Sequence, residues 1–184
     1  MAEILRAEWF DINNKDKDKL CSWLHGVFFP NLQSQNGVNW VAHYDIVPHP
    51  ETRYIKGAPA KKEVKDLSVP PGQENLVLTS VNTPSIFFGH NNALEAMEKE
   101  QRLYLSMRTN YHSAVFIEEE MINGPELHIQ PLGTGGAPAM QFGSYNVDGI
   151  RDDIELAKWY RRERFPRLPV TRGMIRGRKF LSIS

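Results

Sequence analysis

The sequence predicts an α+β protein built from strand–helix–strand units. Three observations support this fold class. Segments rich in β-forming residues alternate with amphipathic helical segments along the 184-residue chain. The order strand, helix, strand occurs three times, and one set of residues recurs near both ends. The content of 41% hydrophobic and 24% charged residues is typical of one globular domain or two small ones.

The first unit begins with residues 3–12, which mix β-formers with polar residues and predict a strand. Helix-capping residue types follow this strand. The next apolar residues then fall at helical spacing: Leu20, Trp23, Leu24, Val27 and Phe28. Pro30 disfavours helical geometry at the residue before it, so we expect the helix to end there. A turn that closes on Gly37 leads into a second predicted strand at 38–47.

Two further units follow the first. The second is expected to contain a strand, a helix and a strand at 76–82, 92–108 and 113–122. The third is expected to repeat this order at 139–147, 151–165 and 173–183. Two βαβ units form one ferredoxin-like layer of four strands with helices on one face. The sequence therefore predicts a ferredoxin-like domain over 1–122 and an additional βαβ unit over 139–184, packed with it as a partial internal duplication.

Residues 48–74 separate the first two units and carry five prolines and several lysines, which argue against a regular element. A loop of this length in a small domain is typically a lid, a partner-binding arm or a mobile insertion. The sequence leaves these three alternatives open.

The charge balance and the single cysteine limit the partners and the compartment. With 22 basic and 22 acidic residues, nothing indicates a polyanion partner, so we expect no nucleic acid. No apolar run reaches the length of a membrane span, and the start MAEILRAEWF lacks the features of a signal peptide. Cys21 alone excludes an intramolecular disulfide and a Cys-rich metal site. The chain is therefore expected to be cytoplasmic, without membrane contact.

One set of residues recurs at a constant offset. Trp23, Phe29, Pro30, Leu32 and Gly37 align with residues 136 positions later, namely Trp159, Phe165, Pro166, Leu168 and Gly173. In each set the Trp anchors a helix, the Phe-Pro pair ends it, and the Gly permits a turn into a strand. The last strand is more apolar in the other alternation phase, so either a bulge intervenes or the two strands are not equivalent.

The segment WYRRERFPRLPVTRGMIRGRKF (159–180) resembles the signature of EthD-like proteins of the dimeric α+β-barrel type. In that signature a helix reading roughly WYxxEHxP is followed by a Leu, a Gly and a basic-aromatic strand. The resemblance covers about the last 40 residues well and residues 3–47 more loosely. It implies ferredoxin-like sheets that pair face to face into a barrel, by dimerisation or by duplication, and we expect a homodimer. Members of the family are associated with breakdown or biosynthesis of aromatic or polyketide compounds.

The family's His before x-Pro is replaced here by Arg164, and by Phe28 in the first unit. Arg164 can bind an anionic ligand or pair with a carboxylate. The alternative is a solvated charge that complements the helix dipole.

Alternation along the strand at 38–47 places Trp40 and Tyr44 on the face that helices cover, and His43 and Asp45 on the opposite face. In the resembling fold, that opposite face lines the barrel. A His beside a carboxylate can act as a general base, with a raised pKa and a fixed tautomer. The alternative is a solvated polar pair.

The remaining motifs give no metal or cofactor site. Glu118 and Glu120 are expected to share one face with Phe116, either as weak metal ligands or as charges that protect an edge strand. The segment GTGGAP (133–138) precedes a strand and not a helix, so nucleotide binding is rejected. No particular His is marked as a haem ligand.

The aromatic residues suffice to line a pocket or to fill a small core: Trp9, Trp40, Phe87, Phe88, Tyr104, Tyr111 and Phe116. The hypothesis is a small aromatic or polyketide-like ligand inside the barrel, bound by Trp9, Phe116 and Arg164. His43 and Asp45 would be the catalytic residues of a cofactor-independent enzyme. The alternative is a non-catalytic module for assembly or interaction with a partner.

Overall fold

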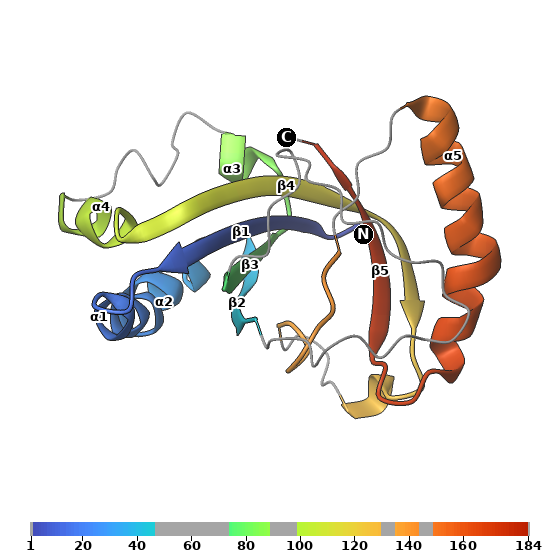
Figure 1. Ribbon diagram of the computed structural model, residues 1–184, viewed down its shortest axis with the longest axis horizontal. Helices are drawn as coiled ribbons and strands as arrows, with labels where there is room; N and C mark the ends of the chain where they lie inside the picture. Colours follow the sequence, from blue (N-terminus) through green and yellow to red (C-terminus); the bar gives the residue numbers. More distant parts are fainter. Residues whose placement is uncertain (1, 47–73, 89–98, 130–134, 144–148, 184) are drawn as a thin grey trace.

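The computed structural model describes residues 2–46, 74–88, 99–129, 135–143 and 149–183. Within these ranges the protein has an α+β structure with one antiparallel sheet (Figure 1). The strands are β1 (Ile4–Ile12), β2 (Val38–Asp45), β3 (Asn75–Val81), β4 (Arg108–Asn123) and β5 (Arg176–Ser182). The helices are α1 (Lys17–Trp23), α2 (Phe29–Gln33), α3 (Ser85–Phe88), α4 (Lys99–Leu105) and α5 (Ile150–Trp159). The predicted α+β class is confirmed.

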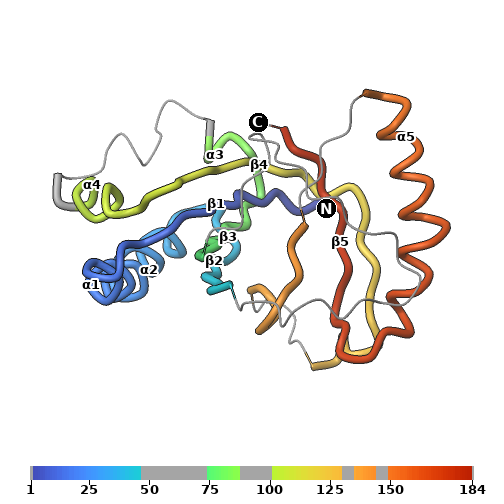
Figure 2. The backbone as a smooth tube through the Cα atoms, in the orientation of Figure 1, coloured from blue at the N-terminus to red at the C-terminus, as the bar shows by residue number. Residues whose placement is uncertain are grey.

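The strand order is β2-β3-β1-β4-β5. All neighbouring strands are antiparallel, and β1 is hydrogen-bonded to β3 on one side and to β4 on the other. β5 joins the same sheet at the outer side of β4. Helices α1, α2 and α4 lie together at one end of the sheet, and α5 lies beside the opposite end (Figures 1 and 2).

The hydrophobic core occupies both faces of the central strands. On one face, α1 and the segment that follows it pack on β1 and β3 through Phe10, Leu20, Trp23, Leu24, Phe29 and Val77. The opposite face contains another cluster of buried residues: Leu5, Ala7, Trp9, Leu76 and Leu78. Every residue of β3 is buried, which requires cover on both sides of the sheet.

Several predicted elements differ in their bounds. The helix predicted over 92–108 is present as α4 from Lys99, and β4 already begins at Arg108, five residues before the predicted strand. Residues 139–143 form no strand, so this part of the strand predicted at 139–147 is wrong. Residues 144–147 of that predicted strand and residues 48–73 of the predicted loop lie outside the described residues.

The recurring residues stand in backbone elements that match in part. The expected helix end at Phe29 is wrong, because α2 runs from Phe29 through Pro30 to Gln33, whereas the second Phe-Pro pair begins a 3-10 helix, Phe165–Val170. Trp23 and Trp159 each end an α-helix, and each is followed by a five-residue π-helical segment, Leu24–Phe28 and Tyr160–Arg164. The glycines that close the two sets have left-handed φ angles, 91° at Gly37 and 83° at Gly173. The two Trp environments differ, because Trp23 is 8% exposed and Trp159 is 49% exposed.

These glycines allow a matched stability experiment. Gly173→Ala meets no atom within 4 Å, so it should cost only the left-handed backbone strain, about 1–2 kcal/mol. Gly37→Ala adds a Cβ only 2.7 Å from Ile86 Cδ1, so its loss should exceed that of Gly173→Ala by about 1 kcal/mol or more. Urea unfolding measures both losses of stability.

Gly26→Ala is the control, because Gly26 lies in a helical segment with free space around it, so this substitution should be neutral or stabilising. Equal losses at Gly37 and Gly173 would contradict the close contact with Ile86.

Candidate functional site

Side chains that could bind a ligand or exchange a proton gather at two places, one on each face of the sheet. We call the first the histidine cluster; its members are His25, His43 and Asn75. We call the second the aromatic face; its members are Trp9, Trp40, Tyr44, Phe116, Phe142 and Phe180. His43, Trp9 and Phe116 were predicted to form a single site, but His43 lies in the histidine cluster, whereas Trp9 and Phe116 share the aromatic face.

The expectation that His43 lines the face opposite the helices is wrong. The register of β2 against β3 shifts between Val38 and Trp40, and this bulge reverses the alternation for the rest of the strand. His43 therefore faces the helical side, where its ring lies 6.0 Å from Phe29 and 6.2 Å from Phe10. Trp40, expected beneath the helices, packs on the aromatic face instead.

The histidine cluster is a chain of hydrogen bonds that starts at a fully buried amide. Asn75 is 0% exposed, and its Nδ2 donates to the Phe10 carbonyl at 3.3 Å, so its Oδ1 is left as an acceptor. His43 Nε2 lies 3.1 Å from this oxygen, and His43 Nδ1 lies 3.0 Å from His25 Nε2. We therefore assign the proton of neutral His43 to Nε2, which leaves Nδ1 to accept a hydrogen bond from His25.

Burial lowers the pKa of His43 below its ordinary value of 6.5. The hydrogen bond with Asn75 and the charge of Asp45 act in the opposite direction, but desolvation is the larger effect. The expected rise in the pKa of His43 is therefore wrong. Asp45 lies exposed at the end of β2 and acts on His43 through its charge. His43 is neutral at pH 7 and orients the exposed ring of His25.

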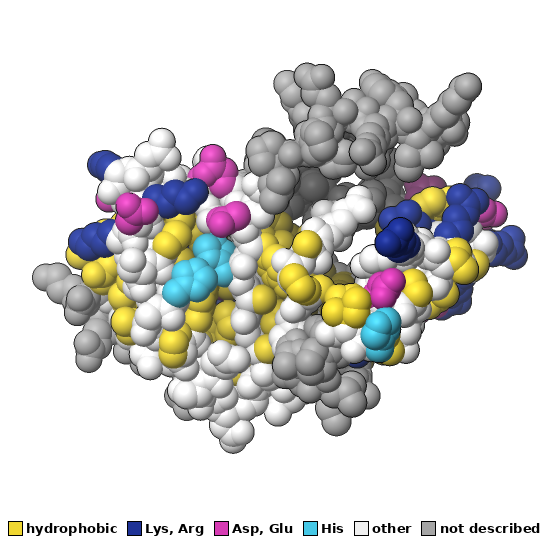
Figure 3. Space-filling view, turned by 90° about the horizontal axis from the view of Figure 1, so that it is seen from below, with side chains coloured by type: hydrophobic (Ala, Val, Ile, Leu, Met, Phe, Trp, Pro, Cys, Tyr) yellow, Lys and Arg dark blue, Asp and Glu magenta, His cyan; other side chains and the backbone are white. Residues whose placement is uncertain are grey.

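His25 is a member of this cluster that sequence reasoning missed. It stands in the π-helical segment Leu24–Phe28, and no motif connects it with β2. The pairing of His25 with His43 depends on the bulge in β2, which carries no local sequence signal. In the space-filling view, histidine side chains lie beside acidic and basic side chains at the α1–α2 end (Figure 3).

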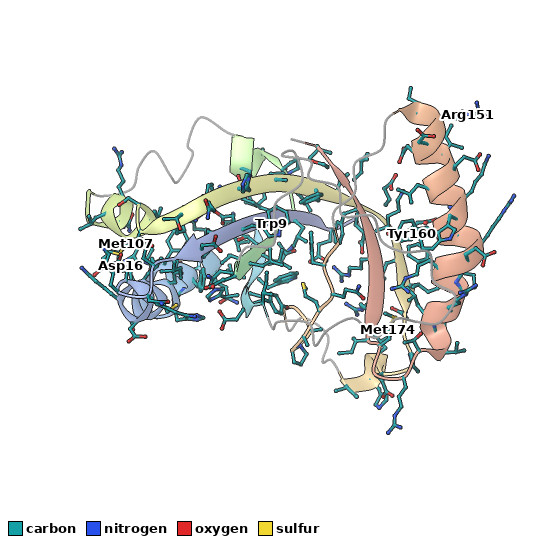
Figure 4. The ribbon with its side chains drawn as sticks, viewed as in Figure 1. Trp9, Asp16, Met107, Arg151, Tyr160 and Met174 are labelled. Carbon is teal, nitrogen blue, oxygen red and sulfur yellow. The ribbon has the colours of Figure 1, made fainter. Side chains whose placement is uncertain are left out.

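The aromatic face centres on three rings in edge-to-face contact. The ring centroid of Trp9 lies 5.5 Å from that of Phe142 and 6.3 Å from that of Phe116, and the two Phe rings lie 6.2 Å apart. The structure thus brings the predicted ligand-binding residues Trp9 and Phe116 together. Figure 4 shows Trp9 in the middle of the sheet. Figure 3 shows apolar side chains gathered between the α1–α2 end and α5.

The segment 135–143 covers part of this face and carries Phe142. The Tyr44 hydroxyl donates a hydrogen bond of 2.8 Å to the Ala137 carbonyl. Gly136 passes so close that a Cβ at this position would collide with the Tyr44 hydroxyl. In the described part of the GTGGAP motif, the backbone therefore lies close to the side chains of β2.

A polar border adjoins the aromatic rings. Glu3 Oε1 accepts hydrogen bonds from Trp40 Nε1 at 2.7 Å and from Ser80 Oγ at 2.6 Å. The Arg178 guanidinium pairs with the carboxylate of Glu3 and lies 3.5 Å from Glu118 Oε1. We call Glu3, Glu118 and Arg178 the glutamate–arginine network. Burial raises the pKa of Glu118 and lowers that of Arg178.

Glu120 does not join this network, contrary to the expectation that it shares a face with Glu118. The pairing of β4 with β5 shifts register between Glu118 and Glu120. Glu120 Oε1 accepts a 2.6 Å hydrogen bond from Arg161 Nε, in the segment after α5. β4 is also no edge strand, because β5 pairs with its outer side.

Arg164 lies apart from both places. It is exposed at the end of the π-helical segment after α5, beside the opposite end of the sheet from α1. Figure 4 shows Tyr160, four residues before it, on that side of the molecule, distant from Trp9. A single bound molecule of small size cannot contact Arg164 and the histidine cluster together.

Among the described residues, no three His, Cys, Asp or Glu side chains are placed to hold a metal ion. The described helices are all too short or too polar to cross a bilayer. The chain matches no protein-family model, and no curated protein or solved structure is significantly similar to it.

The lowered pKa of His43 gives a pH dependence of stability. Below about pH 6.5, unfolded His43 binds a proton more readily than folded His43. The free energy of unfolding should therefore be highest above pH 7 and should fall as the pH decreases through the folded pKa. His43→Gln removes the titrating group and should flatten this decline, as measured by urea unfolding between about pH 7.5 and pH 5.

His128→Gln serves as the control, because the His128 side chain is 74% exposed. This variant should follow the wild-type profile. A His43→Gln profile with the wild-type slope would show that another group causes the decline.

Proposed function

We propose that this protein binds a small aromatic molecule on the aromatic face of its sheet. One observation carries the proposal: the rings of Trp9, Phe116 and Phe142 meet edge to face beside the glutamate–arginine network. Small-molecule sites are typically apolar and aromatic, with a few polar groups that orient the ligand. Aromatic rings also favour offset or edge-to-face contact with another ring.

We further propose that the fold is ferredoxin-like and related to the EthD-like barrels. The order β2-β3-β1-β4, with helices after β1 and after β3, supports this proposal because two βαβ units with these connections form such a layer. The matching elements after Trp23 and Trp159 support a partial internal duplication. In a barrel of this type, the face opposite the helices is the interior, and here that face is the aromatic one.

The proposed ligand site does not include all of the predicted residues. His43 faces the helices, and Asp45 and Arg164 lie elsewhere, so a molecule that contacts Trp9 does not reach them. His43 and Asp45 remain candidate catalytic residues only for a molecule bound at the histidine cluster. Catalysis on a molecule bound at the aromatic face, without a cofactor, would need acid–base groups on that face itself.

An assembly function is the second candidate, and exposed apolar side chains favour it. Leu181 of the outer strand β5 is 46% exposed, Ile183 just after this strand is 43% exposed, and Met121 of β4 is 49% exposed. Pairing of two chains in a homodimer would cover such side chains. Light scattering after size-exclusion chromatography distinguishes a dimer from a monomer.

The binding proposal is tested with a panel of phenols, naphthols, quinones and flavones in calorimetric titrations. Phe116→Ala removes one ring of the three and should raise the Kd of any bound compound about tenfold. Trp9→Phe keeps a ring and should have a smaller effect. Turnover is followed in parallel by absorbance.

Trp159→Phe is the matched control, because Trp159 is 49% exposed and lies at the end of α5. It should leave binding unchanged, and circular dichroism checks that every variant folds. The proposal is wrong if no compound binds, or if Phe116→Ala binds as tightly as the wild type.

A further inference from the structure

We propose that Glu118 and Arg176 make the aromatic face selective for neutral rings that carry both a hydroxyl group and a carbonyl group. In this assignment the ligand hydroxyl donates to Glu118 Oε1, and Arg176 Nε donates to the ligand carbonyl. The inference rests on the proposed function, because it names the ligand class of the same face.

Glu118 stands beside residues of the aromatic face. It stands two residues after Phe116 on β4, and it is paired across the strands with Phe180 of β5. Directly paired residues in an antiparallel sheet point to the same side and lie in side-chain contact range. Both neighbours belong to the aromatic face, so the carboxylate of Glu118 borders the rings.

The polar atoms beside the rings differ in their hydrogen bonding. Glu3 Oε1 already accepts two hydrogen bonds, and Glu118 Oε2 accepts one from the Glu3 backbone N–H at 3.2 Å. Within the described part of the chain, three atoms of these groups are buried without a hydrogen-bond partner: Glu3 Oε2, Glu118 Oε1 and Arg176 Nε. Glu3 Oε2 is engaged in the ion pair with the Arg178 guanidinium. Glu118 Oε1 makes only an ion pair of 3.5 Å with Arg178. One acceptor and one donor are therefore left to be satisfied by a bound molecule.

The acidic and basic side chains near the rings are equal in number. Two carboxylates, Glu3 and Glu118, stand near two guanidinium groups, Arg176 and Arg178. These four side chains carry no net charge between them. An anionic or cationic ligand would add an uncompensated charge to partly buried groups, which is unfavourable. A neutral hydroxyl and a neutral carbonyl satisfy the free acceptor and donor without changing the charge.

The test compares 6-hydroxyflavone with 6-methoxyflavone and flavone in calorimetric titrations of the whole chain. Wild-type protein should bind 6-hydroxyflavone about tenfold more tightly than 6-methoxyflavone, because the ether has no proton to donate. Glu118→Gln should reduce this ratio to about twofold or less and leave the affinity for flavone unchanged, since the amide is a weaker acceptor than a carboxylate. Arg176→Met should weaken the binding of all three flavones, which share the carbonyl group.

Glu120→Gln is the matched control, because Glu120 pairs with Arg161 and lies away from the network. It should keep the wild-type ratio. Equal affinities of wild-type protein for the hydroxy and methoxy compounds overturn the inference, and this comparison needs no variant to fold. Tighter binding of 6-hydroxy-2-naphthoate than of 2-naphthol also overturns it, since that ligand is charged.

The two proposals fail in distinguishable ways. Only the ligand class is wrong if aromatic compounds bind through Phe116 but show no preference for the hydroxyl group. The same holds if other aromatic compounds bind and none of the flavones does. If no aromatic compound binds at all, the proposed function and this inference fail together.

Discussion

The two central strands, β1 and β3, are covered on both faces, so the polar side chains buried on them are limited to internal partners. Four polar residues of these strands are buried: Glu8, Asn75, Thr79 and Ser80. A buried polar group that lacks a hydrogen bond is costly. Glu8, Asn75 and Ser80 have internal hydrogen-bond partners, whereas Thr79 Oγ1 has none among the described residues. Asn75 thus orients His43, and Ser80 helps to hold Glu3, so both candidate sites begin at buried polar residues of β3.

Glu8 shows how the same constraint joins distant parts of the chain. Its Oε1 accepts hydrogen bonds from the Tyr111 hydroxyl at 2.6 Å and from Arg108 Nη1 at 3.2 Å, and Arg6 Nη2 lies 3.5 Å away. Tyr111 reaches Glu8 beside an irregularity of β4, where Asn110 has a φ of 49°. The buried carboxylate therefore stabilises the pairing of β1 with β4 at the point where the register shifts.

Register shifts explain which predictions of the candidate sites succeed. Trp9 and Phe116 are brought together because alternation runs undisturbed through the paired segments Ile4–Trp9 and His112–Ile117. His43 and Glu120 each follow a bulge, and each lies on the face opposite to the expected one. A strand has a period of two, so one inserted residue moves all later side chains to the other face.

The sequence by itself determined the α+β class, the order of most elements and the recurrence of Trp, Phe-Pro and Gly at both ends. These features depend on local periodicity and on backbone preferences, both of which can be read from residues close together in the sequence. Only the tertiary structure decided the strand order, the bulges, and the contacts of His25 with His43 and of Glu3 with Arg178. Such contacts join residues far apart in the chain, and they depend on how strands pair and pack, which no local pattern encodes.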